Sequence, residues 1–130
     1  MSKISENNPH QAQLDLISRF YLALDTRDWD QLPTVLAEDA VLRTRMVRQG
    51  VRGPEVGHVE GRDAIIAMIQ GLWERLAGTH HMTSNHIVEI GADGETASGN
   101  CTLRAHHAGI GAKAHLFEES LARIEAMLTK

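Results

Sequence analysis

Two long runs rich in β-branched residues and histidine place the tightest constraint on how this chain folds. The runs are Thr79 to Ile90 and Glu95 to Ala108, and the turn Gly91-Ala92-Asp93-Gly94 lies between them. An Asp-Gly turn between such runs is a strong signal for a β-hairpin. We therefore expect a long antiparallel hairpin in the second half of the chain.

Apolar periodicity predicts two helices near the N-terminus. Asn8-Pro9 is typical of a helix start, because asparagine caps a helix well and proline suits its first position. The first helix is expected to run to about Asp25. Asp28 and Gln31 resemble a capping box, so a second helix is expected to start there.

A short hairpin and a third helix are expected next. The loosely alternating run Val41 to Val47 and the run Glu55 to Val59 are separated by glycines, which indicates two short strands. The third helix is expected after Gly61, with Gly78 as its C-terminal cap. The predicted class is therefore α+β.

Composition limits the function classes. The 130 residues carry a formal net charge of -4 without a basic block, so we do not expect a nucleic-acid partner. No apolar run approaches the roughly 20 residues of a membrane span. The single cysteine, Cys101, excludes an internal disulfide and fits a reducing, cytoplasmic setting. We expect a loose N-terminal arm over residues 1–8 and a single domain over residues 9–130.

One carboxylate falls on the apolar side of the first helix. Asp25 follows Leu14, Ser18 and Tyr21 at helical spacing, which points it toward the interior. The helix dipole disfavours an anion in a last turn, so Asp25 calls for another explanation. The alternative is a frayed last turn with Asp25 in water.

Histidines are concentrated in the long hairpin. Five of the eight occur there, and four of these five form two adjacent pairs: His80, His81, His86, His106 and His107. Neighbouring residues on a strand face opposite ways, so one member of each pair faces a given cavity. Adjacent pairs are poor chelators, and no HxH or HExxH spacing occurs, so we expect no metal site.

Hairpin register decides which histidines face inward. A three-residue loop over Ala92 to Gly94 places His81 on one face with Leu103, Ala105 and His107. An even-length loop instead places His81 beside Arg104 and His106. A shift of one residue exchanges the two faces, so both registers remain open at this point.

Three segments together resemble the SnoaL-like family of the nuclear transport factor 2-like superfamily, in its scytalone dehydratase and dehydrochlorinase branch. They are Leu24-Asp25-Thr26-Arg27-Asp28-Trp29-Asp30, Glu60-Gly61-Arg62-Asp63-Ala64-Ile65 and Thr79-His80-His81-Met82-Thr83-Ser84-Asn85. The resemblance covers about Pro9 to Ala108. It implies a cone-shaped domain in which three helices pack on a curved antiparallel sheet and close a pocket.

The resemblance also implies roles for particular residues. Asp25 matches the aspartate that orients the catalytic histidine, His81 matches that histidine, and His107 matches a second pocket histidine. Two tyrosines of the fungal dehydratase are replaced here, which implies a more apolar pocket and a substrate other than scytalone. The substrate-binding residues that we expect on this basis are Tyr21, Leu24, Met46, Asn85 and Leu103.

The C-terminal residues depart from the family pattern. Members of the family end with two long strands, whereas only residues 112–130 follow Gly109-Ile110-Gly111. Their apolar residues are helix-spaced, but family context predicts a strand over about Lys113 to Ile124. In either case a final strand is lacking, so we expect shortened or replaced C-terminal strands. An incomplete sheet exposes an edge and an apolar face, so we expect a homo-oligomer, a dimer or higher.

The expected function is that of a cofactor-independent lyase or isomerase. A neutral histidine is a competent base near pH 7, and a carboxylate on its other nitrogen fixes the tautomer. Such a pair suits dehydration or double-bond isomerisation of a cyclic polyketide, terpenoid or aromatic small molecule. The alternative is a non-catalytic ligand-binding or assembly module of the same fold.

Overall fold

The structure is a computed structural model that describes residues 8–113 and 117–129. The expected N-terminal arm, apart from Asn8, lies outside this part of the chain. No helix in the described ranges is long and apolar enough to cross a membrane. The elements, in chain order, are α1 (Pro9–Thr26), a 3-10 turn (Trp29–Gln31), α2 (Leu32–Val35), β1 (Val41–Arg48), β2 (Val51–Glu60), α3 (Arg62–Trp73), β3 (Leu76–Ile90), β4 (Thr96–Gly109), a 3-10 turn (Gly111–Lys113) and β5 (Phe117–Thr129).

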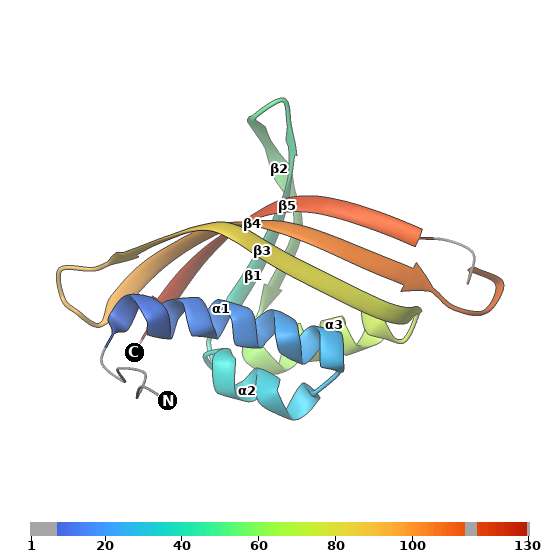
Figure 1. Ribbon diagram of the computed structural model, residues 1–130, viewed down its shortest axis with the longest axis horizontal. Coiled ribbons are helices and arrows are strands. Elements are labelled where there is room, and N and C mark those ends of the chain that lie inside the picture. The colour runs from blue at the N-terminus through green and yellow to red at the C-terminus, as the bar shows by residue number, and fades with distance from the viewer. Residues whose placement is uncertain (1–7, 114–116, 130) are drawn as a thin grey trace, which may run out of the picture.

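The strands form two antiparallel sheets. β3, β4 and β5 make a three-stranded sheet in that order, and β1 and β2 make a separate two-stranded sheet. The larger sheet curves over the helices, which lie together on one side of it (Figure 1). The expected α+β cone, with three helices against a curved antiparallel sheet, is confirmed.

Helix α1 begins and ends close to where the sequence predicts. The side chain of Asn8 accepts hydrogen bonds from the backbone N–H groups of His10 and Gln11, at 3.0 and 3.3 Å. The helix ends at Arg27, whose backbone is left-handed with a φ of 55°. These caps place Asp25 in the last complete turn of α1, next to the sheet.

The core is built mainly by the helices. α1 contributes Ala23 and Leu24, α2 contributes Leu32, and α3 contributes Ile65, Ile69 and Trp73, all less than 9% exposed. Leu32 is completely buried. A single buried leucine side chain contributes roughly 1.5–3 kcal/mol through apolar burial, so this cluster fixes how α1 and α3 meet.

Two local expectations are wrong. Asp28 makes no side-chain cap for the 3-10 turn that follows it. Gly78 does not cap α3, because α3 ends at Trp73 and β3 has already started at Leu76, which pairs with Gly109. The glycine that looked like a helix terminator is therefore a strand residue.

The C-terminal residues form a strand. β5 pairs with β4 along its length, from Phe117 opposite Ala108 to Thr129 opposite Thr96. The helical alternative is therefore wrong, because the exposed edge of β4 supplies backbone partners that local spacing does not reveal. Within the described residues, one long strand follows the hairpin where the family pattern has two.

The register of the long hairpin results from two irregularities that cancel. The Gly91 N–H donates to the Thr96 carbonyl at 2.8 Å, so the loop between them, residues 92–95, has an even length. The pairing then shifts by one residue between Ser84 and Ile87, at a β-bulge. Beyond the bulge, His81 pairs with Ala105, as the odd-loop register would also place it.

Candidate functional site

Asp25 is held by three hydrogen bonds from β3. The Thr79 hydroxyl donates to Oδ1 at 2.8 Å, and the backbone N–H of His81 donates to Oδ2 at 2.8 Å. The Nδ1–H of His81 donates to Oδ1 at 2.5 Å. The side chain of Asp25 is 17% exposed. The interior placement is thus observed, and the frayed alternative does not apply.

The His81 ring lies in an aromatic sandwich. Its side chain is 5% exposed. Tyr21 stacks on it with a centroid distance of 5.2 Å and an interplanar angle of 24°, and Trp73 stacks at 5.9 Å and 11°. Because Nδ1 donates to Asp25, Nε2 carries the lone pair of the neutral ring. The pair therefore presents Nε2 as a base.

His107 lies next to His81 on the same face of the sheet. The two rings make an edge-to-face contact with a centroid distance of 5.5 Å, and His107 makes another with Trp73 at 6.0 Å. His80 and His106 contact each other edge-to-face at 6.3 Å. They pair across the strands and lie on the opposite face from His81.

A pocket of about 440 Å³ opens beside the Asp25–His81 pair. Besides Tyr21, three of its lining side chains carry hydroxyl groups. The lining residues are Ser18, Tyr21, Leu22, Asp25, Thr79, His80, His81 and Thr83. Most of the surface that lines the pocket is apolar, as expected, although Leu24 faces the helical core and does not contribute to it.

The other expected substrate-binding residues are placed differently. Leu24 is 3% exposed within the core, and Leu103 is 8% exposed on the inner face of β4. Asn85 is exposed and forms part of the bulge, with a φ of 55°. Met46 lies on β1, and its side chain is outside the described part of the structure. Leu24, Leu103 and Asn85 do not line the pocket.

Tyr21 is a hydrogen-bond donor in this setting. Burial raises the pKa of Tyr21 well above its ordinary value of 10.0, and the nearby Cys101 raises it further. The phenol therefore stays protonated across the neutral range. Its hydroxyl makes no hydrogen bond to any described residue, so it is available to a molecule in the pocket.

Two residues of the site were not expected from the sequence. Thr79 holds Asp25, and its signal is its position two residues before His81, which places both on one strand face. The other residue is Trp73, whose indole belongs to the core cluster. It is buried there, its Nε1–H donates to the Leu24 carbonyl at 3.0 Å, and its ring also covers His81. Core packing and the site share this one side chain.

Within the described ranges, no group of three or more His, Cys, Asp or Glu residues could hold a metal ion.

The fold and the carboxylate–histidine pair define a class: small nuclear transport factor 2-like α+β domains that enclose a pocket between helices and a curved sheet. The chain belongs to the SnoaL-like domain family, whose pattern it matches over residues 11–128.

Solved structures share this fold at low sequence identity. A proposed scytalone dehydratase of Novosphingobium aromaticivorans has a TM-score of 0.77 at 16% identity, over 93% of this chain and 73% of that one. A hexachlorocyclohexane dehydrochlorinase of Novosphingobium barchaimii has a TM-score of 0.71 at 16% identity, over 93% and 75%. A proposed aromatic ring hydroxylase of Novosphingobium aromaticivorans has a TM-score of 0.71 at 20% identity, over 92% and 76%.

These neighbours bear different enzyme names, so the likeness assigns the fold and leaves the reaction to the site. A search of curated protein sequences gave no match. The chemistry must therefore be argued from the residues around Asp25 and His81.

Proposed function

We propose that the chain is a cofactor-independent lyase or isomerase in which His81 is the general base and Asp25 positions it. The observation that carries this proposal is the 2.5 Å hydrogen bond from His81 Nδ1–H to Asp25. It fixes the tautomer that leaves the Nε2 lone pair for proton abstraction. The stacked rings of Tyr21 and Trp73 restrict the imidazole to one orientation.

The chemistry needs no group beyond these side chains. His81 Nε2 takes a proton from a carbon next to a carbonyl group, and the C–H electron pair becomes a carbon–carbon double bond. In a dehydration the β-hydroxyl group leaves and departs with that proton as water. In an isomerisation the proton returns to a different carbon. General acid–base help of this kind is worth about 10²–10⁴ in rate.

Tyr21 and His107 are proposed to assist. The protonated phenol of Tyr21 lines the pocket and is suited to donate to a substrate carbonyl as negative charge develops there. His107 lies 5.5 Å from His81, ring centre to ring centre, on the inner face. We propose that it donates a proton to a leaving oxygen, although it lies behind His81 and is not one of the residues that line the pocket. The pocket combines a mainly apolar lining with the hydroxyl groups of Ser18, Thr79 and Thr83, which favours an oxygenated cyclic substrate.

The test uses a panel of cyclic β-hydroxy ketones and follows enone formation by ultraviolet absorbance, with deuterium uptake from D₂O for isomerisation. We expect His81→Ala and Asp25→Asn to lower turnover by about 10²–10⁴. Thr102→Val, on the opposite face of β4, is the control. Turnover that persists in both site variants would contradict the proposal.

The tautomer itself gives a readout that is independent of substrate. We expect ¹⁵N NMR to show the proton of neutral His81 on Nδ1 in the wild type. In Asp25→Ala the ring loses the acceptor that selects this tautomer, so the Nδ1–H preference should disappear. An unchanged ¹⁵N pattern in Asp25→Ala would mean that Asp25 does not position His81.

The alternative is a non-catalytic assembly module. The outer face of the sheet supports the part of this alternative in which the chain forms an oligomer. Met82, Ile87 and Met127 are 38%, 61% and 78% exposed. Strand alternation and register place all three on the face opposite His81. We propose that a second copy of the chain covers this face. If the chain is only a module, Asp25→Ala and His81→Ala leave ligand binding and oligomeric state intact.

A further inference from the structure

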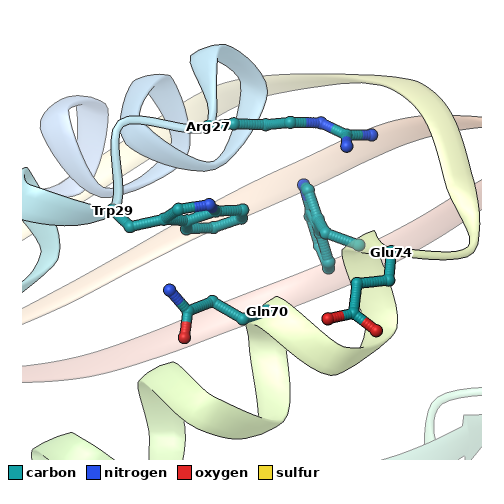
Figure 2. Close-up of a pocket in the computed structure, with 5 residues that line it drawn as sticks. Arg27, Trp29, Gln70 and Glu74 are labelled. Carbon is teal, nitrogen blue, oxygen red and sulfur yellow. The ribbon is translucent and has the colours of Figure 1, made fainter.

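A second hollow, of about 290 Å³, lies between the end of α1 and the end of α3. Its lining residues are Arg27, Trp29, Gln70, Trp73 and Glu74, and none of them lines the pocket beside Asp25. Figure 2 shows Arg27 and Trp29 on one side, and Gln70 from α3 and Glu74 just after α3 on the other. The Asp25–His81 chemistry makes no use of this hollow.

Both tryptophans of the chain line this one hollow. Trp73 is 8% exposed and is fixed by the hydrogen bond from its Nε1–H to the Leu24 carbonyl. Trp29 is half-buried and packs against the same core cluster. The half-buried indole of Trp29 offers a planar aromatic molecule a stacking surface, and the small exposed part of Trp73 adds to the same wall. The Gln70 side chain adds an amide donor and acceptor beside them.

The hollow also contains one group of each charge. The Arg27 guanidinium is anchored because its Nη2 donates to the Leu76 carbonyl. Guanidinium has five N–H donors, so most remain for a ligand. The Glu74 carboxylate makes no hydrogen bond or ion pair with any described residue, and it does not pair with Arg27 across the hollow. The cation is therefore positioned without a carboxylate partner among the described residues.

We propose that this hollow binds a small planar aromatic monocarboxylate. The ring lies against the indoles of Trp29 and Trp73, and the carboxylate takes the guanidinium of Arg27, whose planar fork matches carboxylate geometry. Glu74 selects against a second negative charge on the ligand. The hollow shares only Trp73 with the surroundings of His81, and its test measures binding, so it does not depend on turnover.

The test follows the two indole N–H signals by ¹H–¹⁵N NMR while benzoate is added. Because the chain has two tryptophans, each signal reports on one wall of the hollow. We expect a saturable shift of the Trp29 signal. Arg27→Gln should weaken benzoate binding by about tenfold or more, since it removes a charge-assisted hydrogen bond. Arg75→Gln, which removes a nearby arginine outside the hollow, should leave it unchanged.

A second experiment compares the binding of two ligands to protein in which Arg27 is unchanged. Terephthalate should bind more weakly than benzoate, and Glu74→Gln should reduce that difference. Glu74 is exposed, so this variant is expected to fold. Absence of a saturable Trp29 shift would overturn the proposal. Weakening of benzoate binding by Arg75→Gln to the same extent as by Arg27→Gln would also overturn it. So would benzoate binding that is abolished by Tyr21→Phe but not by Arg27→Gln, because benzoate would then lie in the pocket beside Asp25.

Discussion

Asp25 holds His81 at two points, because both the ring Nδ1–H and the backbone N–H of His81 donate to its carboxylate. One side chain at the end of α1 therefore fixes the position of β3 and the orientation of the imidazole together. Movement of the helix end relative to the strand would break both bonds at once. The geometry of the proposed base thus depends on how α1 packs against the sheet.

Thr79 should contribute to stability through Asp25. Its hydroxyl donates to the carboxylate at 2.8 Å in a half-buried site. Thr79→Val keeps the shape and removes the donor, and hydrogen bonds to charged groups are worth about 1.5–3 kcal/mol. We expect urea denaturation to show a loss of this size. Thr44→Val, at an exposed position on β1 away from the proposed interface, should change the free energy of unfolding by less than about 0.5 kcal/mol.

Asn85 should be sensitive to side-chain branching. Its backbone is left-handed, with a φ of 55°, at the bulge that sets the register of His81. Asparagine tolerates this conformation, whereas β-branched residues do not. We expect Asn85→Val to lower the free energy of unfolding by about 1–2 kcal/mol. Asn85→Gly, which relieves the constraint, serves as the control. Equal stability of the two variants would contradict the assigned backbone strain.

The Asp93 turn should weaken in acid. The backbone N–H groups of Glu95 and Thr96 donate to the Asp93 side chain and lower its pKa below the ordinary value of 3.8. A lowered pKa contributes stability above the unfolded value, and that stability is lost as pH falls through the folded value. The urea midpoints of wild type and Asp93→Ala should therefore differ at pH 7 and converge toward pH 2.

A matched charge control accompanies this measurement. Asp39→Ala removes one carboxylate outside the turn. The urea midpoints of wild type and Asp39→Ala should not show the convergence toward pH 2 that is expected for Asp93→Ala. If Asp93→Ala and wild type differ by the same amount at every pH, the side-chain hydrogen bonds of the turn do not depend on the charge of Asp93.

Cys101 should react slowly in the folded protein. It is 2% exposed on the inner face of β4, and burial raises the pKa of its thiol. Both effects lower the concentration of accessible thiolate, which is the nucleophile. We expect a disulfide reagent to label the thiol slowly at pH 8 and rapidly in urea. Rapid labelling without denaturant would mean that β4 opens readily or that the thiol is accessible.

The outer face of the sheet should control assembly. Ile87 is 61% exposed there, and a lysine at this position would place a charge in the proposed interface. We expect light scattering after size-exclusion chromatography to show an oligomer for the wild type and a smaller species for Ile87→Lys. Val51→Lys, at a 70% exposed position on the β1–β2 hairpin, is the control. A monomeric wild type would remove the basis for this interface.

Local patterns predicted the elements whose signals are contained in a short segment. Asn8 and Pro9 marked the start of α1, and the spacing of Tyr21 and Asp25 placed the carboxylate on the inner side. The strand β5 was not resolved by the same reasoning, because its helix-spaced apolar residues gave no sign of the β4 edge that pairs with them. Tertiary pairing decided there against local propensity.

The site shows the same division. The family motif predicts that Asp25 and His81 form a pair, and the structure places the two side chains in contact. Leu24 and Asn85 were assigned to the pocket from matching positions, yet one packs in the core and the other forms the bulge. A single inserted strand residue leaves no compositional trace, so the sequence offered no way to foresee the bulge.

The bulge at Asn85 has a consequence for how such a chain can diversify. It separates two paired segments of the long hairpin whose registers differ by one residue. One segment carries His81, and the other leads to the turn at Asp93. Insertion or deletion of one residue near the turn can be absorbed by gaining or losing a bulge, without moving the imidazole away from Asp25. Variation in the length of the distal hairpin is thereby uncoupled from selection on the proposed base.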